Sequence, residues 1–434
     1  MEYSRTELMP GVFLNCLRSH KFKTACLSVT LLTQLQRESA SMNALIPFVL
    51  RRGTTQYGDM SSLSARMDEL YGTAIEPVVR RIGEIQCVGF FASFPEQDFI
   101  PGGEPLLGQA AALTCQLLLS PVTRGGLLLP EYVDSEREKL IDLIRSQLND
   151  KRSYAAFRCI EEMCCCEDFA VSRYGDVDEA RRINYKKLTK HYKNLLQTCP
   201  IELIYCGRAT EAELAAVLRD ALSTLPRGEI CDDIGTEIRM NALEDKPRFV
   251  EESKDVTQGK LVMGFRMGEC MEDPDVAALS VFNCVYGSGA SSKLFMNVRE
   301  KLSLCYYASS GVYVHKGIML VHSGIDFDKL EEARAEILAQ LDSVRKGEIS
   351  DEELESAKRS VASDLRAAMD SQGELEGFWL AQAVDGLDYG PLELAERVDA
   401  VTRQDVIDVA KGIECDLVYF LKGGGQEEAD DAEL

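Results

Sequence analysis

The amino-acid sequence predicts an α+β protein of two similar domains, each a mostly antiparallel sheet with helices packed on one face. The chain has 434 residues, which is more than one hydrophobic core normally organises. Similar segments also recur at an offset of about 230 residues. Within each copy, strand-like patterns lie beside helix-like patterns, which indicates helices packed against a sheet.

The repeat is clearest in two pairs of segments. "SSLSARMDELYG" at 61–72 resembles "SSKLFMNVREKLS" at 291–303, because each begins with two serines and continues as an amphipathic helical pattern. A strand-like stretch follows each of them, starting at Glu84 and at Gly317. We therefore expect each half to contain the same helix followed by the same strand.

An apolar strand is predicted to close each half, "CPIELIYCG" at 199–207 and "CDLVYFLKG" at 415–423. The polar stretch before the second half has few periodic signals, which is typical of a linker. The last residues are glycine-rich and then acidic, which is typical of disorder. The predicted organisation is an N-terminal domain at 1–225, a linker at 226–247, a C-terminal domain at 248–422 and an acidic disordered tail at 423–434.

A long helical region is predicted before each closing strand. In the first half it runs from Glu131 to Cys166, and in the second from Ser350 to Met369. Ser350 is followed three residues later by Glu353, which is the pattern of a capping box at a helix start.

The charge balance excludes several classes of partner. The formal net charge is -23, so a nucleic acid would be repelled over most of the surface. No apolar stretch approaches the roughly 20 residues needed to cross a bilayer. The N-terminal "MEYSRTELMP" also lacks the pattern of a signal peptide. We predict a cytoplasmic protein with no nucleic-acid or membrane partner.

The fifteen cysteines are predicted to be reduced and mostly to pack as small apolar side chains. Their number is odd, and no C-x-x-C pair occurs. The densest cluster is Cys164-Cys165-Cys166, and consecutive residues on a helix point about 100° apart, so these three cannot converge on one ion by themselves. We predict neither a cofactor nor a metal among them.

Three stretches resemble a known family. "LIPFVLRRGTTQY", "MDELYGTAIE" and above all "GASSKLFMNVREKLSLCYYASSG" are similar to the pitrilysin, insulinase and mitochondrial processing peptidase family of metallopeptidases, the inverzincins. The resemblance covers the whole chain except the acidic tail. It looks closest to inactive bacterial members associated with aminopentanol modification of elongation factor P. It implies two domains that enclose a chamber.

The resemblance also indicates that the zinc site of the active members is lost. Those enzymes carry H-x-x-E-H on a helix, where two histidines bind zinc and the glutamate activates water. The matching positions before Gly53 are Ala44, Pro47 and Phe48, and none has a metal donor. The third ligand position matches Leu143, and a shift of one residue to Asp142 turns the side chain by about 100°.

The stretch that contains Ala44 and Pro47 is predicted to serve only packing. Pro47 is tolerated there if Asn43 is the N-cap and the proline lies in the first turn. The chain has only four histidines, His20, His191, His315 and His322. The last two lie seven residues apart in one strand-like region, which places them on opposite faces of a regular strand. A lone histidine on such a strand is more often a packed or surface residue than a metal ligand. We predict that the chain binds no metal.

The resemblance implies that one pair of functional residues is retained. Arg299 and, seven residues later, Tyr306 match an arginine and a tyrosine that hold the substrate carbonyl and stabilise the oxyanion in active members. The alternative is a solvated helix arginine and an ordinary strand aromatic. Tyr307 is adjacent and is expected to face the other side of the strand, so it serves as an internal control.

The resemblance implies peptide recognition by strand addition, with the candidate sheet edge around Cys87 to Phe94.

Three functions stay open. The first is a noncatalytic partner that supplies Arg299 and Tyr306 to a zinc-bearing homologous peptidase subunit. The second is a stand-alone peptide-binding or scaffolding protein, either a single chain or a homodimer. The third, a hydrolase with an unrelated site, has the least support because no G-x-S-x-G motif occurs.

Overall fold

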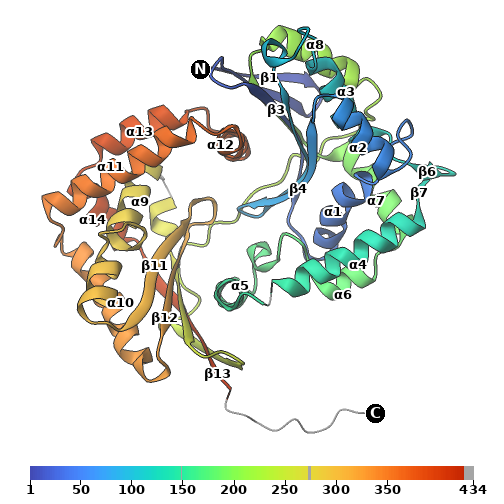
Figure 1. The fold of residues 1–434 in the computed structure, drawn as a ribbon. Helices are drawn as coiled ribbons and strands as arrows, with labels where there is room; N and C mark the ends of the chain where they lie inside the picture. The colour runs from blue at the N-terminus through green and yellow to red at the C-terminus, as the bar shows by residue number, and fades with distance from the viewer. Residues whose placement is uncertain (148, 272–274, 425–434) are drawn as a thin grey trace, which may run out of the picture. The chain divides into compact units, whose positions relative to one another are not determined.

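The computed structural model describes residues 1–147, 149–271 and 275–424, which form two compact units (Figure 1). Each unit combines three separate stretches of the chain. The first unit consists of Met1–Ser146, Val171–Thr236 and Ala368–Gly390, and the second of Gln147–Ala170, Glu237–Ala367 and Pro391–Leu434.

The first unit is built around a six-stranded sheet in the order β1-β2-β8-β3-β5-β4. All neighbouring strands are antiparallel except β2 and β8, which run parallel. The strands are β1 (Glu2–Met9), β2 (Val12–Arg18), β3 (Thr24–Gln34), β4 (Ala74–Ile82), β5 (Ile85–Pro95) and β8 (Ile201–Gly207), and a separate hairpin joins β6 (Thr123–Arg124) to β7 (Leu127–Leu128).

The second unit has a five-stranded sheet in the order β11-β12-β10-β13-β9. Here the parallel pair is β13 with β9, and the other neighbours are antiparallel. The strands are β9 (Arg248–Lys254), β10 (Gly259–Arg266), β11 (Cys305–Tyr313), β12 (Ile318–Ile325) and β13 (Glu414–Gly423).

The predicted repeat is confirmed by the strand order. Reading β4-β5-β3-β8-β2 in the first sheet gives the same sequence of pairings as β11-β12-β10-β13-β9 in the second, with the parallel pair in the same place. Of the six strands in the first sheet, β1 alone has no counterpart among the described strands of the second sheet. The α+β class with mostly antiparallel sheets is confirmed as well.

The predicted sheet edge is wrong. Cys87 to Phe94 lie in β5, and β5 is hydrogen-bonded to β3 on one side and to β4 on the other. The open edges of the two sheets are therefore β1 and β4 in the first and β11 and β9 in the second.

Most helices of each unit pack on one face of its sheet, as predicted, but each unit also has a helix on the opposite face that comes from the other half of the chain. In the first unit this is α12 (Gln372–Asp385), which packs on β8 and β3. In the second it is α5 (Lys151–Met163), which packs on β10 and β13. The two halves thus exchange one helix each.

The remaining helices have the following bounds. The first unit contains α1 (Arg37–Leu50), α2 (Met60–Glu69), α3 (Leu107–Leu119), α4 (Pro130–Ser146), α6 (Val177–Arg181), α7 (Tyr185–Thr198) and α8 (Glu211–Ala221). The second contains α9 (Val276–Asn283), α10 (Leu330–Arg345), α11 (Asp351–Ala368), α13 (Pro391–Ala400), α14 (Arg403–Lys411) and the π-helix η5 (Leu294–Lys301).

Two predicted helical regions can be compared with these bounds. The region from Glu131 to Cys166 is divided, because α4 ends at Ser146 and α5 begins at Lys151. The capping box before α11 is confirmed: Glu353 N donates to Ser350 Oγ at 3.1 Å, and Ser350 N donates to Glu353 Oε2 at 2.7 Å.

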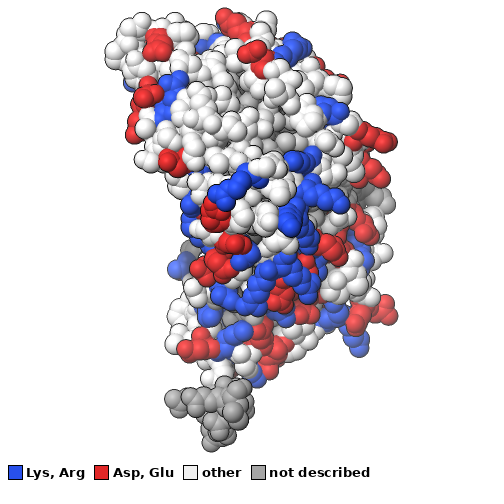
Figure 2. Space-filling model, turned by 90° about the vertical axis from the view of Figure 1, so that its right-hand side faces the viewer, with Lys and Arg blue, Asp and Glu red and all other residues white. Residues whose placement is uncertain are grey.

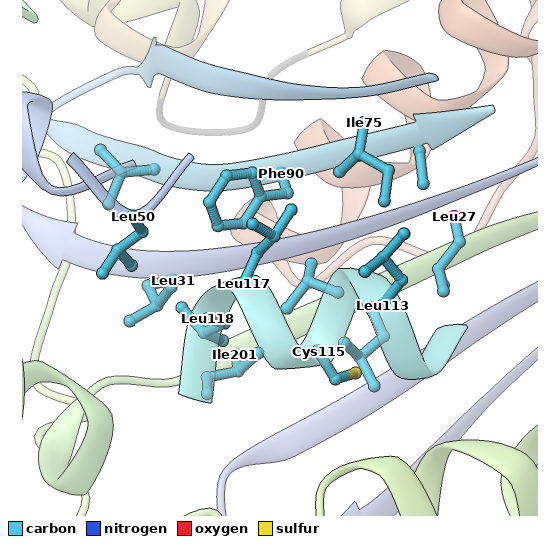
Figure 3. Close-up of a cluster of buried hydrophobic side chains, with 14 of the residues drawn as sticks. Leu27, Leu31, Leu50, Ile75, Phe90, Leu113, Cys115, Leu117, Leu118 and Ile201 are labelled. Carbon is cyan, nitrogen blue, oxygen red and sulfur yellow. The ribbon is translucent and has the colours of Figure 1, made fainter. Parts of the chain in front are cut away.

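The main core of the first unit lies between its sheet and α3 (Figure 3). Leu27 and Leu31 of β3 and Phe90 of β5 are on the sheet side of this core. Leu113, Leu117 and Leu118 of α3 meet them from the helix side, and all six side chains are buried. Burying a leucine of this kind stabilises the fold by about 1.5–3 kcal/mol.

The core of the second unit includes a network of buried charges. Arg266 on β10 is fully buried and donates to Glu167 Oε1 at 2.6 Å and to Asp416 Oδ2 at 2.9 Å. Lys316 Nζ lies 2.6 Å from Glu167 Oε2, and Arg248 Nη2 lies 3.1 Å from Asp416 Oδ1. Through this network Glu167, just after α5, is linked to β10, β13 and β9.

The segment 226–247, predicted as a linker, contains no helix or strand. It is nevertheless bonded to its surroundings, since Cys231 N donates to Thr198 O at 2.7 Å and Glu84 N donates to Thr236 Oγ1 at 2.9 Å. At the C-terminus, β13 extends through Gly423, and residues 425–434 of the predicted acidic tail lie outside the described residues.

Charged side chains of both signs are interspersed over the lower part of the face in Figure 2, where α4 and α6 lie. Arg137 of α4, for example, lies 2.8 Å from Asp134 and 3.1 Å from Glu138. Exposed pairs of this kind contribute at most about 1 kcal/mol each. Among the described residues, no helix is both long enough and apolar enough to span a bilayer.

Candidate functional site

Helix α1 carries the three positions that match the zinc motif. Ala44 and Pro47 are buried, and Phe48 packs partly buried against the core of the first unit. A methyl group, a pyrrolidine ring and a phenyl ring offer no metal donor. The residues at these positions therefore do not fit a zinc ion.

The predicted start of this helix is wrong. The helix begins at Arg37 after an extended Gln36, so Asn43 is not the N-cap and Pro47 lies in the helix interior. A proline there removes one backbone hydrogen bond, at a typical cost of about 3 kcal/mol or more. Asn43 instead turns its side chain into the core, where Nδ2 donates to Thr33 Oγ1 at 3.1 Å and to Gln86 Oε1 at 2.9 Å.

Helix α4 carries the position that matches the third zinc ligand. The Leu143 side chain is 37% exposed, and neighbouring Asp142 faces solvent beside Arg145. The carboxylate of α4 that does turn inward is Glu136, which pairs with Arg52 at 2.9 Å and Lys139 at 2.8 Å. Both cations contact its Oε1, as in an ordinary structural ion pair.

No group of three or more His, Cys, Asp or Glu side chains in the described part of the chain is arranged to hold a metal ion. His315 lies in the 3-10 turn Val314–Lys316 and not in a strand, whereas His322 lies on β12. His322 is mostly buried, and burial lowers its pKa to about 4. It therefore stays neutral near pH 7.

Arg299 lies on η5 of the second unit and points its guanidinium over the ring of Phe295, with 4.7 Å to the ring centroid. Its Nε is 3.5 Å from Glu300 Oε1, and the side chain is 41% exposed. Both contacts are with its own helix. The cationic group is thus held at the surface with donors left for a ligand.

Tyr306 lies at an irregularity of β11. Cys305 pairs with Ile325 and Tyr307 pairs with Gly324, so Tyr306 is the extra residue of a bulge. Bulges re-aim side chains, and Tyr306 is 63% exposed. Its hydroxyl donates to Asp326 Oδ1 at 3.3 Å. Within the described residues no hydrogen bond joins Tyr306 to Arg299.

Tyr307 behaves differently from its neighbour. Its ring is half-buried and lies against the guanidinium of Arg152, with 4.4 Å to the ring centroid. Burial is the main cause that raises the pKa of its hydroxyl. Two adjacent tyrosines therefore have different environments, and Tyr306 is the one that solvent reaches.

Comparison with known proteins identifies the family. The family described as "Peptidase M16 inactive domain" matches residues 182–361. The probable inactive metalloprotease YmfF of Bacillus subtilis is 30% identical over 415 residues, which cover 95% of this chain and 96% of that protein. The chain belongs to the M16 metallopeptidase family.

Two further similar proteins differ in how much of the chain they match. The crystal structure of a conserved protein from Enterococcus faecalis has a TM-score of 0.88 and 26% identity, covering 98% of this chain and all of that one. An uncharacterized zinc protease of Rickettsia bellii is 27% identical over 164 residues, 37% of this chain and 40% of that protein. The predicted family is confirmed, and this M16 chain is a homologue of inactive members; the association with elongation factor P remains a prediction.

Sequence reasoning missed a buried polar cluster beside the vacated zinc positions of this M16 homologue. His191 Nε2 lies 2.5 Å from Asn43 Oδ1, and Gln86 Nε2 donates to Ala40 O at 3.0 Å and to Arg173 O at 2.6 Å. Asn43 Oδ1 carries no hydrogen and can only accept, so Nε2 of His191 carries the proton of this hydrogen bond. Burial lowers the His191 pKa, so the ring stays neutral. Gln86 inside an apolar strand pattern was the signal that could have indicated it.

Proposed function

We propose that this M16 homologue is a noncatalytic subunit that binds peptides and supplies Arg299 and Tyr306 to a zinc-bearing relative. One observation carries the proposal. The metal positions of the first unit hold Ala44 and Pro47, while the second unit keeps a guanidinium and a phenol at the surface. Both groups can donate to the oxygen of a peptide carbonyl and stabilise the charge that develops there during hydrolysis.

Peptide binding is proposed to occur by strand addition to β11. A peptide that pairs with a sheet edge needs free backbone donors along that edge. Strand β4, an open edge of the first sheet, contains Pro77, which has no N–H to donate. Strand β11 contains no proline and carries Tyr306 at its start. A peptide along β11 would lie next to one of the two proposed donors.

We place the protein in the cytoplasm. All fifteen cysteines are free thiols, and ten of them are buried. Free thiols in this number are typical of a reducing compartment.

The test is to coexpress the chain with a zinc-bearing M16 relative from the same cell, purify the complex and measure peptide cleavage. Arg299→Ala should lower kcat by at least about tenfold without loss of the complex, since it removes a donor to the developing oxyanion. Lys301→Ala removes one charge from the same helix and should leave the rate unchanged. Tyr306→Phe should also lower the rate, since it removes the second proposed donor.

Equal rates for Arg299→Ala and Lys301→Ala would refute the catalytic contribution. Failure to form any complex would refute the partner role. The second candidate, a stand-alone peptide-binding or scaffolding protein, is favoured by the open β11 edge, which needs no second subunit to accept a strand. It predicts peptide binding by the isolated chain that a chelator does not change, with a dimer detectable by sedimentation.

A further inference from the structure

We propose that one face of the second sheet is a carboxylate-binding site, and that the peptide which adds to β11 is acidic. The site consists of Arg152, Lys260, Tyr307, Ser309 and His322. This proposal extends the proposed function by naming the class of peptide that the β11 edge would accept. It rests on the proposed function only for the geometry of strand addition.

The floor of the site is the ring of Tyr307. Gly324 on β12 pairs with Tyr307 on one side and with Lys260 on the other. A Cβ at Gly324 would lie only 2.4 Å from Tyr307 Cε1 and 2.9 Å from Gln258 Oε1. Because Gly324 has no side chain, the ring of Tyr307 can lie over the neighbouring strand β12.

Two cations lie against this ring. The guanidinium of Arg152 is 4.4 Å from the ring centroid, and its Nη2 donates to Ser309 Oγ at 3.3 Å. Lys260 Nζ is 5.9 Å from the same centroid and donates to Gln258 Oε1 at 2.6 Å. Both cations thus share one aromatic surface and bond only to neutral groups.

Neither cation has an ion-pair partner among the described residues, although the protein carries a net charge of -23. Neighbouring cations of this unit are paired: Lys254 lies 3.2 Å from Glu252, and Arg158 lies 3.3 Å from it. The nearby carboxylate, Asp150, accepts from Arg152 N at 3.1 Å and Ser153 Oγ at 2.6 Å, since it is the N-cap of α5.

The two unpaired cations act on each other. Burial lowers the pKa of Lys260, the charge of Arg152 lowers it further, and the Asp150 carboxylate opposes this only as the smallest of the three causes. His322 lies directly across from Ser309 in the strand pairing, and its Nδ1 is buried without a hydrogen-bond partner. A carboxylate placed between these groups would relieve the repulsion of the cations and offer an acceptor to their donors.

The strand geometry indicates which part of a ligand would reach them. Tyr307 and Ser309 are two residues apart on β11 and face the same side of the sheet. A peptide paired with the free edge of β11 places every second side chain on that side. A glutamate or aspartate at alternate positions would therefore lie beside Arg152, whose planar guanidinium suits a carboxylate.

The test measures peptide binding by the isolated full chain at low salt, using fluorescence anisotropy. The probes are two labelled decapeptides, one of alternating Glu and Thr and one of alternating Gln and Thr. We expect the Glu peptide to bind at least about tenfold more tightly, against the repulsion of the whole acidic protein. In Arg152→Gln/Lys260→Gln that preference should disappear. In Lys346→Gln/Arg359→Gln, which removes two exposed cations elsewhere in the same unit, it should persist.

Equal affinity for the two peptides, a preference that survives in Arg152→Gln/Lys260→Gln, or no binding of either peptide would overturn the proposal. Free glutamate at the same charge concentration serves as a third probe, and displacement of the Glu peptide by it at equal potency would show that the strand contributes nothing. If the double variant does not fold, Arg152→Gln alone, an exposed position, should reduce the preference in part. Loss of this preference with an intact Arg299 effect on cleavage would leave the partner role standing.

Discussion

The first unit and the second unit each cover one face of their sheet with a helix from the other half of the chain, but different contacts hold the two helices. In the first unit, Trp379 of α12 stacks on Tyr3 with 3.5 Å between ring centroids, and Leu375 is fully buried beside it. The ion pair of Arg80 with Glu376, at 2.5 Å, accompanies these apolar contacts.

In the second unit the segment that contains α5 is held by the buried charge network. Glu167, directly after the cysteine run, bonds to Arg266 and Lys316, and all three side chains are fully buried. An apolar contact can be repacked after a substitution, whereas a buried charge that loses its partner cannot reach water. Both units receive one exchanged helix, but single substitutions are expected to lower the free energy of unfolding more in the second unit than in the first.

The largest effect is expected for Arg266→Leu. It leaves Glu167 and Asp416 with fewer partners in the core and should destabilise the second unit by about 3–5 kcal/mol. Urea unfolding followed by far-UV circular dichroism measures the loss. Arg366→Leu breaks an exposed pair with Asp399 and should cost at most about 1 kcal/mol. A result for Arg266→Leu no larger than this control would contradict the comparison.

Leu375→Ala tests the first unit. It removes a buried side chain under α12 and should cost about 2–4 kcal/mol through the lost burial and the cavity. The only tryptophan of the chain is Trp379 on the same helix, so its emission reports the unfolding of this unit. Leu387→Ala, just after α12 in the same unit, where the side chain is 38% exposed, is the matched control. If Leu375→Ala lowers the free energy of unfolding more than Arg266→Leu does, the first unit is the one more sensitive to substitution.

Two substitutions at the vacated zinc positions should differ from each other. Ala44 has no exposed surface, so Ala44→His forces a larger polar ring into a filled core and should cost about 1–3 kcal/mol. Leu143 is at the surface, so Leu143→Glu should change the stability by less than about 0.5 kcal/mol. Thermal unfolding of both variants checks this. Equal costs would mean that α1 and α4 are packed differently from the structure described.

The smallest effect appears only in acid. Burial opposes the shift, but hydrogen bonds from Tyr154, Tyr419 and Lys254 lower the pKa of Glu252 from 4.5 to about 2. A carboxyl whose folded pKa lies below its unfolded value stabilises the fold above pH 4.5 and loses that contribution as the pH falls toward 2. In the first unit, burial raises the pKa of Glu202 instead, so its contribution is present in acid and fades as the pH rises.

We therefore expect the second unit to lose stability first as the pH falls from about 5 to 2. The measurement is an acid titration that compares circular dichroism with the emission of Trp379. Glu252→Gln should remove part of the pH dependence of the second unit and leave the emission transition where it is. Coincident transitions for both units in the wild-type chain would argue against this difference.

Local patterns were sufficient for much of the site and for the repeated fold. The Ser-Ser helices and the apolar strands after them predicted two sheets of one design, because side chains at spacings of two, three and four residues report which face is buried. The loss of metal donors at Ala44, Pro47 and Phe48 needed only the residue types. The wrong start of α1 arose because Asn43 was taken as a cap, whereas its amide serves Thr33 and Gln86.

By itself, the sequence determined the class of fold, the repeat, the family and the chemistry that the zinc positions can no longer perform. Tertiary structure alone decided which sheet each exchanged helix covers, and that β5 is an interior strand while β11 is an edge strand. It also decided that Tyr306 lies in a bulge and that Arg152 and Lys260 both lie against the ring of Tyr307. The physical reason is distance along the chain. Arg152 and Tyr307 are brought together by a strand order and a helix exchange, and no spacing within either segment carries information about the other.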